Sequence, residues 1–174
     1  LLLRLDVAEA RREDALDRVR EILAVAPSHA FANHVLGSIR LHEGNLVAAE
    51  NALRRSLETE RSAGALNDLA NVLIRRGRAV EAVALAREAV ELEPNAASHW
   101  DTLAEALMAR QRPDDAEAAQ RRAVRLAPED SNYARRLEKI REAIKRSAKK
   151  EPPASEARGP AEAGAEQPIG QGFL

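Results

Sequence analysis

Apolar residues recur along the chain in short stretches with helical spacing, and these stretches come in pairs separated by a break. Gly44 and Gly77 lie at two of the breaks, since glycine readily adopts the left-handed conformation that ends a helix. At a third break stands Pro113-Asp114-Asp115, where proline favours a first helical turn and acids complement the helix dipole. Each pair of stretches therefore predicts a hairpin of two antiparallel helices.

The hairpins recur at a fixed period, which the prolines reveal. Pro94 and Pro128 are 34 residues apart, and Pro27 lies 67 residues before Pro94, which is one period of 33 and one of 34. At the position between Pro27 and Pro94 where the period calls for a proline, the chain has Arg61. This spacing predicts three full repeat units, residues 30–62, 63–96 and 97–130.

Aligning the three units shows columns of similar side chains. Three columns hold only small residues: Gly37, Ala70 and Ala104 in the first, Ala49, Ala82 and Ala116 in the second, and Ser56, Ala89 and Ala123 in the third. Beside the first column runs a column of leucine, Leu36, Leu69 and Leu103. Small side chains let helix backbones approach closely, and the leucines fill the seam between successive hairpins. Because one hairpin cannot bury its apolar faces alone, we expect an all-α solenoid in which neighbours share their stability.

The units resemble tetratricopeptide repeats. The family pattern of 34 residues is best matched by Trp100-x2-Leu103-Ala104-x2-Leu107, followed by Ala116 and Pro128. The preceding unit keeps the pattern, whereas the first unit has Asn33 in the aromatic slot and the last has Gln120 in the Phe slot. The resemblance implies a right-handed superhelix whose concave groove, lined by the first helix of each hairpin, holds extended peptides or partner helices.

The two ends of the array differ from the full units. We expect residues 1–29 to form a partial repeat, with Leu1–Glu9 left from a first helix and Glu13–Ala26 as the second, and we expect structure to have preceded them in a longer polypeptide. Residues 131–149 carry one apolar stripe on an otherwise charged helix, as a terminal capping helix requires. Residues 150–174 are rich in Pro, Ala, Gly and Glu, which predicts a disordered tail.

Composition favours a helical scaffold and argues against nucleic acid or a membrane as its partner. Apolar residues make up 45 % of the chain but aromatics only 2 %, so many thin contacts between Ala, Leu and Val are favoured over one thick core. The net charge of −1 gives no long-range attraction for nucleic acid, and the arginine pairs are interleaved with acids. No apolar run predicts membrane insertion. The excess of Arg over Lys suggests a bacterial source, with cytoplasm and periplasm equally open.

Residues that would support catalysis are sparse. The chain has no cysteine, and no phosphate-binding loop or nucleophile motif occurs. Of its four histidines, His34 and His42 share a helix face, but they are two turns apart and lack the third ligand that a zinc site needs. The sequence therefore predicts no enzyme, no metal and no cofactor.

Helical spacing selects the residues of the first helices that face the groove. They are His34, Ser38 and His42 in the first unit, Asn67, Asn71 and Arg75 in the second, and Asp101, Glu105 and Met108 in the third. We expect Arg135 and Lys139 of the capping helix to join them. Asn67 and Asn71 are one helical turn apart and combine a donor with an acceptor, which suits the gripping of a peptide backbone, although hydrogen bonds within the solenoid would explain them equally. Asp101 and Glu105 favour a mixed-charge or a basic and apolar ligand segment.

Two functions follow from these features. The first is a monomeric scaffold that binds a protein or peptide partner in the groove. The second is a structural or docking arm of a larger protein, or a self-associating solenoid, with no separate groove ligand.

Overall fold

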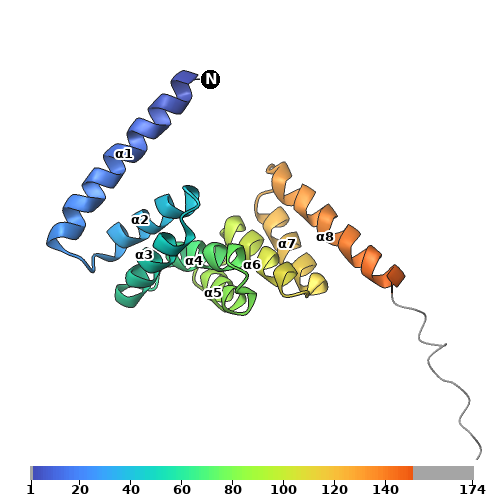
Figure 1. Ribbon diagram of the computed structural model, residues 1–174. Coiled ribbons are helices and arrows are strands. Elements are labelled where there is room, and N and C mark those ends of the chain that lie inside the picture. Colours follow the sequence, from blue (N-terminus) through green and yellow to red (C-terminus); the bar gives the residue numbers. More distant parts are fainter. Residues whose placement is uncertain (1, 151–174) are drawn as a thin grey trace, which may run out of the picture.

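The computed structural model describes residues 2–150 of the chain, with the side chains of residues 12–149. These residues form helices alone, connected by short turns (Figure 1). In chain order the helices are α1 (Leu2–Val25), α2 (Ala30–His42), α3 (Leu46–Thr59), α4 (Ala63–Arg75), α5 (Ala79–Leu92), α6 (Ala97–Ala109), α7 (Pro113–Leu126) and α8 (Ser131–Lys150). The fold is an all-α helical solenoid, as predicted, and each expected full unit contains one hairpin: α2–α3, α4–α5 and α6–α7.

Side chains that precede α2, α3 and α4 cap the first turns of these helices. The side chains of His29, Asn45 and Ser62 accept hydrogen bonds from backbone N–H groups in the first turns of α2, α3 and α4. Pro113 begins α7, where its missing N–H has no helical partner to lose. The short loops between paired helices hold them antiparallel and side by side.

The turn inside each hairpin is made by a residue with positive φ. Gly44 and Gly77 have φ values of +78° and +74°, which confirms their predicted role in ending α2 and α4. In the third hairpin we expected the break from Pro113-Asp114-Asp115, but Gln111 adopts φ +58° and ends α6. Glutamine carries no strong turn signal, so the hydrogen bonds of the surrounding turn, rather than its own preference, hold it in this conformation.

The repeated small residues lie at the tightest contacts of the solenoid. Ala49, Ala82 and Ala116 are fully buried, as are Ala70 and Ala104 of the column that begins with Gly37. The first core cluster extends from α2 to α6, and its fully buried leucines are Leu53, Leu66 and Leu73. A second cluster joins α4 to α8. The core is therefore a continuous thin seam along the array.

One expected break is absent at the N-terminal end. Residues 2–25 form the single helix α1, not a helix remnant ending near Glu9 and a second helix from Glu13. The intervening Ala10-Arg11-Arg12 contains strong helix formers and no glycine or proline, so nothing interrupts the hydrogen-bond ladder. Leu16 and Val19 are buried, while Figure 1 shows the first half of α1 extending away from the stack.

The helix α8 begins at Ser131 and buries Leu137 and Ile140 against the last hairpin. The predicted disordered tail, 150–174, lies outside the described residues except for Lys150, which is the last residue of α8. In the part of the chain that the structure describes, no helix is long and apolar enough to cross a membrane.

Candidate functional site

The first helices of the hairpins, α2, α4 and α6, carry all nine residues predicted to face the groove. Two clefts along these helices bring six of the nine residues into two groups. One cleft has a volume of about 410 Å³ and is lined by Leu41, His42, Asp68, Asn71 and Arg75. The other has a volume of about 270 Å³ and is lined by Asp101, Glu105, Met108, Gln120, Arg136, Lys139 and Ile140. We call them the α2/α4 cleft and the α6/α8 pocket.

In the α2/α4 cleft, much of the polar capacity is already engaged within the solenoid. The Arg75 Nη1 donates to the Leu41 carbonyl at 3.0 Å, and Asn71 Nδ2 donates to Thr102 Oγ1 at 3.4 Å. His42 Nδ1 lies 2.8 Å from the carbonyl oxygen of Ser38. These contacts fix the orientation of the side chains at the wall of the cleft.

Asp68 is a cleft residue that the helical spacing did not select. Its Oδ2 lies 3.1 Å from His34 Nε2 and links α4 to α2. The two residues are 34 positions apart, one more than the 33 that separate equivalent positions of these two units, so the first helices of adjacent units meet here through neighbouring positions. His34 itself lines a separate shallow cleft with Phe31 and Gly64. A search for a histidine and a carboxylate about one repeat apart would have found this pair.

Asn67 is half-buried, and its Oδ1 is buried without a hydrogen-bond donor among the described residues. Ser38 is likewise half-buried. Neither residue lines the α2/α4 cleft or the α6/α8 pocket. The two asparagines therefore differ: Asn71 lines the α2/α4 cleft, whereas the side-chain oxygen of Asn67 is buried within the solenoid.

The α6/α8 pocket is organised by Asp101. Gln120 Nε2 donates to Asp101 Oδ1 at 2.9 Å and to the Tyr133 carbonyl at 3.2 Å. Arg136 Nη1 donates to Asp101 Oδ2 at 2.8 Å and to Glu105 Oε2 at 3.1 Å. Burial raises the pKa of Asp101, an effect that the Gln120 hydrogen bond and the Arg136 charge partly offset. Arg136 thus neutralises much of the acidity expected of this pocket.

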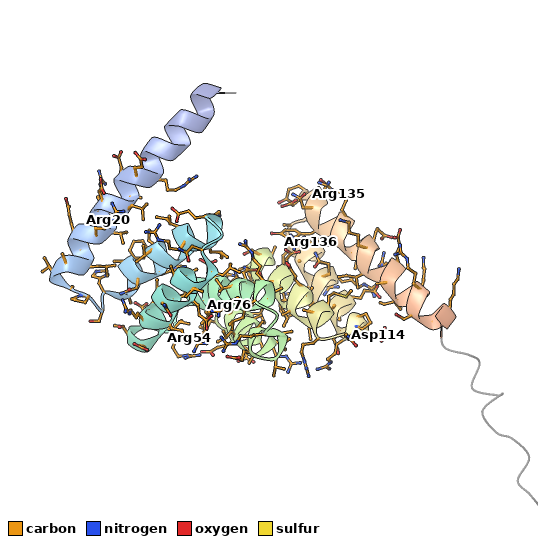
Figure 2. The ribbon with its side chains drawn as sticks, in the orientation of Figure 1. Arg20, Arg54, Arg76, Asp114, Arg135 and Arg136 are labelled. Atoms are coloured by element: carbon orange, nitrogen blue, oxygen red, sulfur yellow. The ribbon has the colours of Figure 1, made fainter. Side chains whose placement is uncertain are left out.

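The capping helix contributes Arg136 to the pocket, not Arg135. Arg135 bonds to the Ser131 carbonyl and the Asn132 side chain, on the exposed surface. Figure 2 shows both arginines at the first turns of α8. Successive residues on a helix point about 100° apart, so an error of one position in the expected facing moves the side chain out of the pocket. Lys139, which was expected to join the groove, does line the pocket, together with the apolar Met108 and Ile140.

The two departures from the repeat pattern replace apolar contacts with hydrogen bonds. Asn33 is 1 % exposed and donates to the carbonyls of Pro27 and His29 at 2.9 and 3.1 Å. Gln120, also 1 % exposed, anchors Asp101. Across the described residues, no three His, Asp or Glu side chains cluster as metal ligands would.

Comparison with known proteins gives the family. Residues 48–97 and 67–131 each match the model of the tetratricopeptide repeat family. No curated protein matches the chain. Among solved structures, MamA from Desulfovibrio magneticus RS-1 is similar with a TM-score of 0.71 and 17 % identity, over 82 % of this chain and 81 % of that one.

Two further similar structures concern peptide binding. YrrB, described as a tetratricopeptide repeat protein with an unusual peptide-binding site, gives a TM-score of 0.66 and 17 % identity over 82 % of this chain and 74 % of that one. The first tetratricopeptide repeat domain of Spaghetti (RPAP3) was solved bound to the HSP90 peptide SRMEEVD. It gives a TM-score of 0.63 and 18 % identity over 67 % of this chain and 93 % of that one. At these identities the likeness shows the fold alone. The match to the family model, together with the period and the packing, shows that the chain belongs to the tetratricopeptide repeat family, whose members are in general protein-interaction scaffolds.

Proposed function

We propose that this chain holds an extended peptide or a partner helix in the groove formed by α2, α4, α6 and α8. The observation that carries the proposal is the pair of open clefts along these first helices, each combining an apolar wall with polar side chains held in place by neighbouring residues. Such preorganisation lowers the entropy cost of binding. The groove acts as a scaffold and has no catalytic role, metal or cofactor.

The ligand segment fits these clefts when it carries both an apolar side chain and polar groups of mixed charge. Met108 and Ile140 offer an apolar surface in the α6/α8 pocket, where Arg136 offsets Asp101 and Glu105. The remaining donors of Arg75 and Asn71 suit backbone carbonyls of an extended segment. Because each such hydrogen bond contributes only about 1 kcal/mol, the affinity is expected in the micromolar range and spread over many contacts.

Two of the similar structures support a peptide ligand. The YrrB structure is described by its peptide-binding site, and the Spaghetti domain was solved with a peptide bound. The likeness to both proteins is one of fold, so their peptides do not predict the peptide sequence that this chain binds. We expect that sequence to be set by the side chains that line the two clefts of this chain.

Selection from a displayed library of random peptides tests the proposal. Peptides retained by the full chain are synthesised and titrated by calorimetry against the wild type and Asn71→Ala. We expect Asn71→Ala to weaken binding about three- to tenfold, since one hydrogen bond is lost. Asn51→Ala, on the exposed surface of α3, is the matched control and should bind as the wild type does. Peptides that bind both variants and the wild type equally would contradict a role of the groove.

The structural-arm alternative is favoured by one observation, the apolar surface at the N-terminal end. Val25 is 89 % exposed and Phe31 68 % exposed. A self-associating arm would bury these side chains between copies, whereas we propose a monomer. Light scattering at increasing concentration separates the two: a constant mass supports the monomeric scaffold, and a rising mass that Val25→Ser abolishes supports self-association.

A further inference from the structure

We infer that the chain has a second binding surface on the opposite, second-helix side of the solenoid, between α5 and α7, which takes an acidic protein segment carrying an apolar side chain. The surface is independent of the groove proposed above. It is lined by Trp100, Leu103 and Leu107 of α6, Ala118 and Ala119 of α7, Asp115, and three arginines, Arg87, Arg122 and Arg125. We call it the α5/α7 cleft.

The floor of the α5/α7 cleft is apolar and fixed. Leu103 and Leu107 are buried, and Trp100 beside them is half-exposed. The indole Nε1 of Trp100 donates to the Pro94 carbonyl at 2.8 Å, which fixes the orientation of the ring. The small Ala118 and Ala119 leave the cleft open, with a volume of about 300 Å³. This space suits one aliphatic or aromatic side chain of a partner.

The rim of the cleft is positively charged. Within the described residues, Arg87, Arg122 and Arg125 form no ion pair, in contrast to the arginines of several other helix surfaces in the array. The acid at the rim, Asp115, is bound to Arg112 at 2.6 Å. Three guanidinium groups around an apolar floor attract carboxylates and bind them in bidentate geometry.

The preceding unit provides an internal comparison. The equivalent cleft between α3 and α5 has a leucine floor and a volume of about 460 Å³, and its two arginines, Arg54 and Arg61, are both ion-paired. Arg54 lies 2.7 Å from Glu50, and Arg61 pairs with Glu88. This first cleft therefore supplies its own carboxylates.

One period later, Val83 and Arg122 stand at the positions of Glu50 and Glu88, the carboxylates that pair with Arg54 and Arg61, whereas Asp115 keeps the acid of Glu81. Arg122 and Arg125 stand 34 positions after Glu88 and Glu91, and Pro94 stands one period of 33 positions after Arg61. The ion pair between Glu88 of α5 and Arg61, in the loop before α4, thus has no counterpart one unit later, where Arg122 of α7 and Pro94 stand at the equivalent positions. The α5/α7 cleft thus keeps one acid, Asp115, which is bound to Arg112, but it has no counterparts of Glu50 and Glu88, and we therefore assign the missing carboxylates to a separate molecule.

An acidic protein segment fits this cleft better than a nucleic acid. The floor offers one aromatic ring and otherwise aliphatic carbon, while successive bases of a bound strand need several stacking platforms. The net charge of −1 provides no general attraction for a polyanion. A segment with carboxylates on both sides of one apolar residue satisfies the rim and the floor together.

The single tryptophan of the chain reports binding directly, because Trp100 forms part of the floor. The full chain of 174 residues is titrated with a blocked synthetic peptide in which two aspartates flank each side of one leucine, and Trp fluorescence is recorded. We expect a saturable change that added salt weakens. The same peptide with lysines replacing the aspartates should give none. An equal response to both peptides, or no saturable response, would overturn the inference.

Charge reversal locates the surface. Arg122→Glu should weaken the acidic peptide at least about tenfold, since one attraction becomes a repulsion. Arg121→Glu, on the exposed neighbouring position outside the cleft, is the matched control and should change affinity little. Circular dichroism verifies folding, and the more exposed Arg125→Glu repeats the test should Arg122→Glu unfold.

Two further measurements distinguish the α5/α7 cleft from the groove and from a nucleic-acid site. Asn71→Ala, in the groove, should leave the acidic peptide bound as tightly as before, so this inference and the groove proposal fail independently. An oligothymidine strand is the nucleic-acid probe. Saturation of the Trp100 signal by that strand, without any by the acidic peptide, would overturn the assignment to a protein partner.

Discussion

At the scale of single residues, two glycines inside first helices face different neighbours. A methyl group added at Gly37 would lie 2.5 Å from Leu53 Cγ and 3.2 Å from the Leu53 backbone nitrogen. Leu53 is fully buried and has no space to move. Gly37→Ala would gain about 1 kcal/mol in helix propensity, but overpacking costs roughly 1–3 kcal/mol. We expect a net loss in the free energy of unfolding, measured by urea titration.

Gly64→Ala is the matched control. Its new methyl group would lie 2.9 Å from His34 Cε1, at the far end of a flexible side chain that is 24 % exposed and can give way by a small change in its side-chain torsions. We therefore expect Gly64→Ala to leave stability unchanged or to raise it. If the two substitutions gave the same change, the close approach of α2 and α3 at Gly37 would not be the cause.

The sequence indicated which residues were unusual but not always what they do. The small column that contains Gly37 predicted its close packing, because the period repeats it in each unit. Asn33 and Gln120 were recognisable as departures from the pattern, yet their partners are backbone carbonyls and Asp101, which only the folded chain brings near. Arg136 was missed in favour of Arg135, because helical spacing alone leaves the facing uncertain by one residue.

At the scale of elements, Glu50 ties α3 to the turn between α4 and α5. Its carboxylate binds Arg78 at 2.6 Å and Arg54 at 2.7 Å, and also pairs with Arg76. Burial would raise the pKa of Glu50, but the Arg78 hydrogen bond and the three arginine charges outweigh it and hold the pKa below its ordinary 4.5. This contribution to stability is therefore present above pH 4.5 and is lost as the pH falls through the lowered pKa.

Glu50→Gln tests this linkage. At neutral pH we expect a loss of about 1–3 kcal/mol, because the three arginines lose the negative charge that they share and one of its two acceptor oxygens becomes an amide group. The difference from the wild type should shrink as the pH falls below 4.5, where Glu50 itself becomes protonated. Urea unfolding at several pH values measures both effects. Glu58→Gln, on the exposed side of the same helix, is the control, and a similar loss there would contradict a specific role for Glu50.

The helices themselves were largely predictable, and the exceptions have a common cause. The hairpin turns at Gly44 and Gly77 follow from residues that favour positive φ, and the start of α7 follows from Pro113. At Gln111 and in the middle of α1 the local sequence carries no such residue. There the chain continues or turns according to its packing and hydrogen bonds, which a period of apolar residues does not encode.

At the scale of the whole molecule, each helix is stabilised mainly by its neighbours in the array. The core clusters span α2 to α8, and the central helices α4 to α6 pack on both sides. Helix α1 packs chiefly against α2, through Leu16 and Val19. In a solenoid with such nearest-neighbour contacts, terminal units open more readily than central ones.

Amide hydrogen exchange should therefore be slowest in α4 to α6 and fastest in α1, because opening α1 breaks chiefly its interface with α2, while opening α4 breaks interfaces with α2, α3, α5 and α6. Leu16→Ala should accelerate exchange in α1 and α2 alone. Leu66→Ala, at a fully buried position of α4, should cost about 2–5 kcal/mol and accelerate exchange throughout the array, because it weakens the seam that couples both halves. Equal protection in every helix, with both substitutions acting globally, would instead mean that the array unfolds as one unit and that α1 is as tightly coupled as the centre.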